Sequence, residues 1–152
     1  MMLFQQKNEN EDEEVQFVYQ RKRENSEGLS LVKYNGKWGF VDNNNQCVIP
    51  FEYENAFSFC EGLSLVKVNG KWGFIDKSNN QVIPCIYNDA YSFKEGLAGV
   101  KLKSRWGFIN KNNEIVIPFR YNYVYSFKNN KAKVLINSSW YKITREGKIC
   151  FE

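Results

Sequence analysis

The chain has 152 residues, of which 43% are hydrophobic, 16% aromatic and 25% charged, a balance that predicts one folded domain and excludes a disordered or collagen-like chain. The formal net charge is +4 and there is no histidine, so the commonest general base and imidazole metal ligand are missing. No signal peptide and no run of 18 apolar residues is recognisable, so neither secretion by a standard signal nor membrane spanning is predicted.

The chain begins with an acidic segment at residues 1–16, which carries five acidic residues against one lysine. We interpret this segment as a solvated, flexible leader or linker. The remaining residues, 17–152, carry a formal charge of +8, which is well short of a dedicated nucleic-acid binder.

Residues 17–152 form a single repeat domain of four 34-residue units without insertion. The units are 17–50, 51–84, 85–118 and 119–152. We call positions that lie 34 residues apart a column, and three columns are invariant. The tyrosine column is Tyr19, Tyr53, Tyr87 and Tyr121; the valine column is Val32, Val66, Val100 and Val134; the tryptophan column is Trp38, Trp72, Trp106 and Trp140.

Each unit is predicted to be a set of short β-strands, because its apolar residues alternate with a period of two and many are β-branched or aromatic. In the second unit we expect extended segments at residues 53–59, 63–68, 71–76 and 81–83. Asn35-Gly36 and Asn69-Gly70 predict type I′ hairpin turns, which need positive φ at both central residues.

Two further columns predict turns, because they hold the residue types that best tolerate a left-handed conformation. These columns are Gly28, Gly62, Gly96 and Asn130, and Asn45, Asn79, Asn113 and Gly147. Pro50, Pro84 and Pro118 lack a backbone donor, so we expect them to end a strand or to place it at a sheet edge.

The segments GKWGFVD, GKWGFID and RWGFIN recur beside VIP and EGL. On these motifs residues 17–152 resemble the WG-repeat family, also called KWG repeats. The resemblance implies a protein of a kind found mostly in bacteria, with a variable number of repeats and no settled biochemical activity. The fourth unit departs from the family pattern, with Trp140-Tyr141 in place of Trp-Gly and Lys142 in place of Phe.

The end units are more polar than the inner ones. In the fourth unit, Lys131 stands in a column that holds leucine in the earlier units. Lys133 stands in a column of leucine or glycine, and Lys142 stands in a column of phenylalanine. We therefore expect the leucines and phenylalanines of one unit to pack on the following unit. Polar end units predict an all-β, open, solenoid-like array of hairpin repeats. A small propeller or a closed, barrel-like ring is the alternative, although 34 residues are few for a propeller blade.

Two basic columns flank the hairpin turn, and stacking would align them into a stripe that could bind phosphates. They are Lys33, Lys67 and Lys101, and Lys37, Lys71 and Arg105. The alternative is that these side chains keep exposed strand ends soluble and prevent edge pairing. The tryptophan column could stack on sugars or bases, but the glycine that follows it in three units indicates close backbone packing and a structural role.

The sequence predicts no catalytic, cofactor or metal site. Its carboxylates recur once per unit beside Gly or Asn, which is typical of turns. The four cysteines have no CxxC spacing and no histidine partner, and we interpret them as small apolar residues in a reducing compartment, the cytoplasm.

By elimination, we predict a non-catalytic repeat scaffold that mediates protein–protein interaction with an unidentified protein partner. The alternative is a binding module for an anionic polymer or glycan, nucleic acid included, which would use the basic stripe and the nearby tyrosines Tyr53, Tyr87 and Tyr121. We also predict that the protein has no enzymatic activity and no membrane partner.

Overall fold

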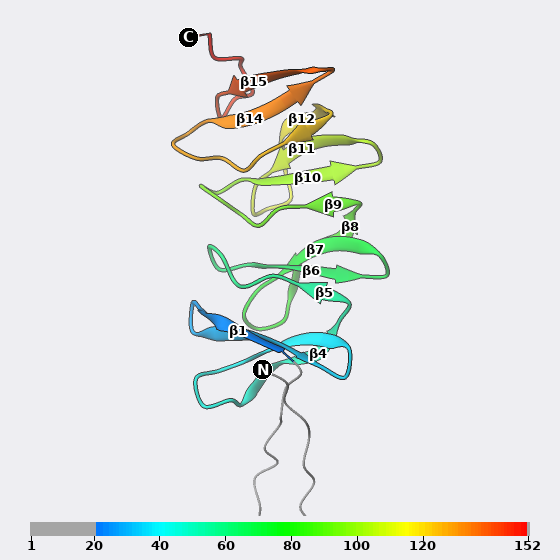
Figure 1. The fold of residues 1–152 in the computed structure, drawn as a ribbon, viewed down its shortest axis with the longest axis vertical. Helices are drawn as coiled ribbons and strands as arrows, with labels where there is room; N and C mark the ends of the chain where they lie inside the picture. The colour runs from blue at the N-terminus through cyan, green and yellow to red at the C-terminus, as the bar shows by residue number, and fades with distance from the viewer. Residues whose placement is uncertain (1–20, 152) are drawn as a thin grey trace, which may run out of the picture.

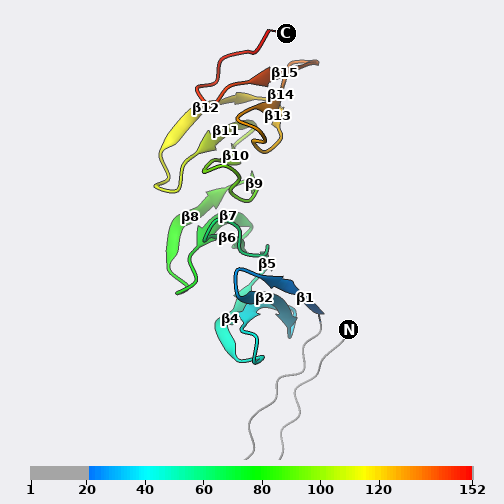
Figure 2. The same cartoon turned by 90° about the vertical axis from the view of Figure 1, so that its left-hand side faces the viewer.

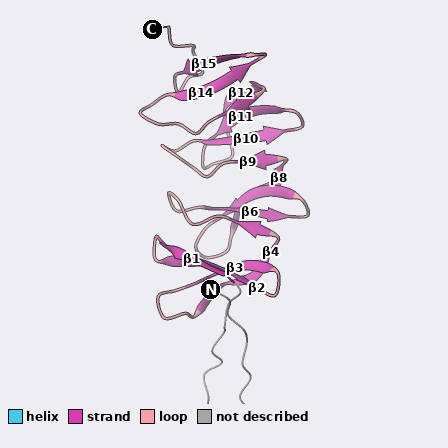
Figure 3. Ribbon diagram, viewed as in Figure 1, coloured by secondary structure: helices cyan, strands magenta, loops and turns pink. Residues whose placement is uncertain are grey.

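The computed structural model describes residues 21–151, which form short β-strands and no helix. The strands make four antiparallel sheets, stacked along the long axis of the molecule in sequence order (Figure 1, Figure 3). The described residues do not close into a ring or barrel, so the prediction of an all-β, open array of repeats is confirmed. Tyr19 and the acidic leader lie outside the described residues.

Each sheet follows the chain from one edge to the other, so that consecutive strands are neighbours. The first sheet contains β1 (Arg21–Ser26), β2 (Leu29–Tyr34), β3 (Lys37–Val41) and β4 (Cys47–Tyr53). The second contains β5 (Asn55–Ala56), β6 (Ser64–Val68), β7 (Lys71–Ile75) and β8 (Gln81–Tyr87). The third contains β9 (Asp89–Ala90), β10 (Ala98–Leu102), β11 (Arg105–Ile109) and β12 (Ile115–Tyr121). The fourth contains β13 (Tyr123–Val124), β14 (Ala132–Ile136) and β15 (Ser139–Ile143).

The turns between the strands have the left-handed residues that the sequence predicts. At the β2–β3 hairpin Asn35 has φ 47° and Gly36 has φ 78°, as a type I′ turn requires. The two predicted turn columns also have positive φ, among them Gly62 at 84° and Asn79 at 62°. Local turn chemistry therefore sets where each hairpin reverses.

The prolines lie on edge strands, as one of the two predicted alternatives states, and they do not end those strands. Pro50 lies inside β4, which is an edge strand of its sheet. β4 pairs through Ile49 with Phe40 and through Tyr53 with Trp38, so three residues of β4 lie opposite one residue of β3. Because Pro50 belongs to this bulge, its missing N–H removes no regular ladder bond, and the strand continues beyond it. Pro84 in β8 and Pro118 in β12 have the same arrangement.

The core consists of layers between consecutive sheets. Leu31 and Phe40 of the first sheet share a buried cluster with Val66 and Ile75 of the second. Between each pair of sheets, one phenylalanine packs edge-on against another with ring centroids 4.8 Å apart: Phe40 and Phe59, Phe74 and Phe93, Phe108 and Phe127. The expectation that one unit buries its leucine and phenylalanine side chains on the next is therefore confirmed.

Candidate binding surfaces

The tryptophan column belongs to the core in the first three sheets. Trp38, Trp72 and Trp106 are buried, whereas Trp140 is 43% exposed. An added Cβ at Gly73, directly after Trp72, would lie 2.5 Å from the carbonyl oxygen of Ile83. The glycine of the Trp-Gly pair therefore leaves room for the bulged edge strand to pack closely. Because the first three tryptophans are buried, they offer no open surface on which a ligand could stack.

The tyrosine column connects consecutive sheets. Tyr53 and Tyr121 are buried, as is Tyr87, whose hydroxyl donates to Asn113 Oδ1 in the following sheet at 2.6 Å. Tyr53 makes the equivalent bond to Asn79. Burial, assisted by the nearby Glu52 carboxylate, raises the pKa of Tyr53 to about 12. Burial also raises the pKa of Tyr87, so the Tyr53 and Tyr87 hydroxyls are neutral structural donors at neutral pH.

The glutamates of the EGL motifs form a second connection between sheets, which sequence analysis assigned only to turns. Glu61 has φ 54° within its turn, and its carboxylate accepts a hydrogen bond from the amide of Gly96 in the next sheet at 2.9 Å. Lys111 donates to the carbonyl oxygen of Glu61 at 2.7 Å and lies 3.6 Å from its carboxylate. The same bonds recur one unit earlier, among Glu27, Gly62 and Lys77. Both the glutamates and the lysines recur at a spacing of 34 residues, and this recurrence could have indicated the connection from the sequence.

The two basic columns lie on opposite faces of each hairpin. Lys33 is paired with Trp38 across the strands, and the adjacent position Tyr34 is paired with Lys37, so the two lysines point to opposite sides of the sheet. The Lys33 ammonium lies 5.8 Å from the centroid of the Trp38 ring, and that of Lys67 lies 5.6 Å from Trp72. The columns are therefore two separate rows, and polyanion binding by them stays a prediction. Lys101 and Arg105 occupy the corresponding positions of the third sheet.

An aromatic row that sequence analysis did not identify lies beside the tryptophans. Phe57 is 5.7 Å from Trp72, Tyr91 is stacked on Trp106 at 5.2 Å, and Tyr125 is 5.5 Å from Trp140, measured between ring centroids. Tyr91 also shares a short hydroxyl–hydroxyl contact with Tyr123, and burial together with this contact raises the pKa of Tyr91. The column spacing of residues 57, 91 and 125 could have shown this row.

A third exposed row is aliphatic and lies on the edge strands β4, β8 and β12, which follow one side of the stack (Figure 2). Val48, Val82 and Val116 are 43%, 41% and 40% exposed, and they occupy one column. Ile86 and Ile115 on the same strands are also exposed. We call these five residues the aliphatic row.

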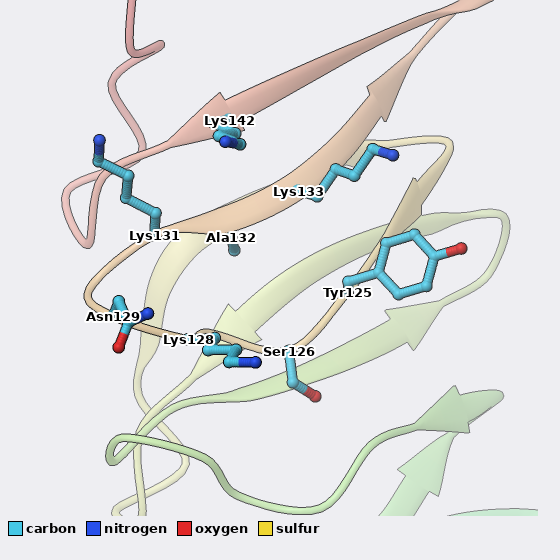
Figure 4. Close-up of a pocket in the computed structure, with 8 residues that line it drawn as sticks. All are labelled: Tyr125, Ser126, Lys128, Asn129, Lys131, Ala132, Lys133 and Lys142. Atoms are coloured by element: carbon cyan, nitrogen blue, oxygen red, sulfur yellow. The ribbon is translucent and has the colours of Figure 1, made fainter.

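The fourth sheet leaves one face uncovered at the end of the stack. Its side chains include Lys128, Lys131, Lys133 and Lys142 with Tyr125 and Trp140, and we call these six residues the end face. Four lysines and Tyr125 line a hollow of about 310 Å³, together with Ser126, Asn129 and Ala132 (Figure 4). The eight lining residues include no carboxylate, so the hollow is suited to an anion.

The cysteines show no arrangement for catalysis. The thiols of Cys47, Cys60, Cys85 and Cys150 are all free. Burial raises the pKa of Cys47 and of Cys85, which disfavours the reactive thiolate. No group of three or more potential metal ligands is present among residues 21–151. The described part of the chain also has no helix of the length and apolarity needed to cross a membrane.

The family comparison agrees with the stacked architecture. The model of the WG containing repeat matches the chain four times in tandem, at residues 7–38, 38–72, 72–106 and 106–140. Each match ends at a member of the tryptophan column, and together they cover most of the chain. No curated protein matches the sequence significantly.

Proposed function

Because the chain belongs to the WG-repeat family, we propose that this repeat scaffold is non-catalytic and binds another protein along one side of its stack. The aliphatic row carries the proposal. It presents exposed Val or Ile side chains from three successive edge strands, at the regular spacing of the sheets. We take the repetition of exposed aliphatic side chains on one side of the stack as the mark of a protein–protein contact surface.

The edge strands favour docking through side chains over addition of a partner strand. Pro50, Pro84 and Pro118 remove one backbone donor from each edge, and the bulges that contain them interrupt the ladder. A partner would therefore recognise the spacing of the aliphatic side chains, which the rigid repeat holds in place.

Several features support a non-catalytic role. The sequence has no histidine, the described carboxylates of the EGL columns are used in turns and between sheets, and burial raises the pKa of two thiols. Four free cysteines also support our expectation of a reducing, cytoplasmic location.

The proposal is tested by affinity capture with the full chain and two matched variants. Val116→Asp changes the aliphatic row, whereas Leu102→Asp makes the same type of change at a residue of similar exposure on the β10–β11 hairpin. We expect a protein captured by the parent chain and by Leu102→Asp to be lost with Val116→Asp. Equal capture by both variants would exclude the aliphatic row as the binding surface.

The second candidate is binding of an anionic polymer or glycan through the basic rows. The repetition of the basic side chains at the spacing of the sheets favours it, because a row of ammonium groups can contact successive anionic groups of a polymer. Retention on heparin that falls steeply with salt, and that Lys37→Glu with Lys71→Glu weakens, would support this function. If the two substitutions left retention unchanged, Lys37 and Lys71 would not belong to the binding site for the anionic polymer.

A further inference from the structure

We propose that the end face binds the acidic residues 1–16 of a second copy of this chain, so that molecules associate head to tail. The proposal is independent of partner binding at the aliphatic row. It rests on the structure of the end face, on the distribution of charge along the chain and on the position of the two ends of the stack.

The end face has a larger positive charge than solubility requires. In earlier sheets the columns of Lys131, Lys133 and Lys142 hold residues that the next sheet buries, such as Leu63, Leu65 and Phe74. Any hydrophilic side chain would keep an uncovered face in solution, yet all three replacements are lysine and a fourth lysine, Lys128, lines the same hollow. Clustered ammonium groups repel one another, and an anionic ligand relieves that repulsion.

The charge of the molecule is polarised along its sequence. The fourth unit, 119–152, contains seven basic and two acidic residues and so carries +5 of the formal +8 of residues 17–152. Residues 1–16 carry −4, from Lys7 and the five acids Glu9, Glu11, Asp12, Glu13 and Glu14. The chain therefore contains an anionic segment whose charge is close to that needed to neutralise the end face.

The fold places the end face at the end of the stack opposite the first sheet, as head-to-tail contact between copies requires. The first sheet, where the described chain begins, and the fourth sheet lie at opposite ends of the stack (Figure 1, Figure 2). When one copy uses its acidic segment on a neighbour's end face, its own end face and the neighbour's acidic segment stay available. Such a heterologous contact does not close on itself and extends into chains.

The uncharged groups on both sides are also complementary. Besides the lysines, the hollow contains the Tyr125 and Ser126 hydroxyls and the Asn129 amide, which can donate hydrogen bonds to carboxylates. The acidic segment begins with Met1, Met2, Leu3 and Phe4, apolar side chains that can pack on the exposed rings of Tyr125 and Trp140.

Sedimentation of the full chain over a range of protein concentrations tests the proposal. We expect the average mass to rise with concentration at about 0.01 M ionic strength, where the Debye length is about 30 Å, and to return to the monomer at about 1 M, where it is about 3 Å. Lys131→Glu with Lys142→Glu should weaken association at least about tenfold, because it reverses the charge of the end face. Lys37→Glu with Lys71→Glu changes the net charge equally and should leave association intact.

A charge exchange identifies the partner segment. The double variant Glu11→Lys with Glu13→Lys should not associate by itself. An equal mixture of this variant with the double variant Lys131→Glu with Lys142→Glu should associate again. Thermal unfolding of each variant confirms that it is folded. A chain that stays monomeric at every concentration in low salt, equal effects of the two lysine pairs, or failure of the mixture to associate would each overturn the proposal.

Discussion

The edge strand beside each buried tryptophan leaves room only for glycine at the next position. A Cβ at Gly39, Gly73 or Gly107 would lie 2.5 to 2.6 Å from a carbonyl oxygen of the bulged edge strand. The nearest atoms that a Cβ would meet belong to the backbone of a strand, which cannot move aside as the end of a flexible side chain can. The Trp-Gly pair is therefore a packing motif.

Gly73→Ala should destabilise the protein by about 1–3 kcal/mol, because the edge strand must shift to admit one methyl group. Gly99→Ala is the matched control, since its added Cβ meets a side-chain atom of Val124 and its column holds Leu31 and Leu65. Urea unfolding of both variants measures the difference. An equal loss of stability in the two variants would contradict the role we assign to Gly73.

The tryptophans differ in what they contribute to stability. Trp72→Ala should lower the free energy of unfolding by about 3–5 kcal/mol, because it opens a cavity in the core between sheets. Trp140→Ala should cost much less, since Trp140 is 43% exposed. Chemical denaturation checks both values, and an unchanged midpoint for Trp72→Ala would show that this ring does not support the core.

At the level of single elements, the turn between the last two strands of a four-stranded sheet closes on one side chain. The Asp76 carboxylate accepts hydrogen bonds from the backbone amides of Ser78 and Asn80, both at 2.9 Å, in the turn between β7 and β8. Asn110 accepts the equivalent bonds in the third sheet. The same turn therefore forms with either a carboxylate or an amide oxygen.

The turn gives stability a defined dependence on pH. Hydrogen bonds from Asn80, and then from Ser78, hold the pKa of Asp76 below its ordinary value of 3.8. A lowered folded-state pKa means that the stabilisation is present above the unfolded pKa and is lost as the pH falls through the folded value. Asp76→Asn should keep the turn but remove the contribution to stability that is lost in acid. Thermal unfolding between about pH 5 and pH 2 would show this difference. An unchanged acid dependence would contradict the assignment.

Bonds between elements of consecutive sheets add to the apolar layers. Tyr87→Phe removes the hydroxyl that donates to Asn113 and should cost about 0.5–1.5 kcal/mol. Tyr125→Phe is the control, since Tyr125 is exposed at the end face. Combining Tyr87→Phe with Asn113→Ala should cost less than the sum of the two single changes. Additive costs in unfolding measurements would show that the two residues do not interact.

At the scale of the whole molecule, stability is distributed along a line. Each sheet packs on its neighbours in sequence, through the phenylalanine pairs and through the tyrosine and glutamate columns. In such a solenoid, stability is the sum of repeat and interface contributions, and the outer faces of the terminal repeats must be hydrophilic. The lysines of the end face meet that requirement.

The open stack predicts an elongated particle in solution. A compact chain of 152 residues would have a radius of gyration of about 15 Å. We expect small-angle scattering, at a salt concentration that keeps the chain monomeric, to give a larger value with an asymmetric distance distribution. A compact value would contradict the stacked arrangement.

The amino-acid sequence alone determined the strand class, the 34-residue period, the hairpin turns and the order of polar and apolar units. These features could be predicted because they depend on local chemistry: a period of two, Asn-Gly at a type I′ turn, and lysine where a following unit is missing. The resemblance carried by the Trp-Gly motifs likewise depends on the letters alone.

The contacts between columns depend on how the sheets stack. Glu61 contacts Gly96, and Tyr87 contacts Asn113, because the stacking of consecutive sheets brings together residues that are 35 and 26 positions apart. The passage of β8 beyond Pro84 depends on a bulge opposite Gly73, and the separation of the basic columns depends on the register of each hairpin. Such contacts follow from the relative placement of whole sheets, which is set by the packing of their faces and is not encoded in the spacing of any single motif.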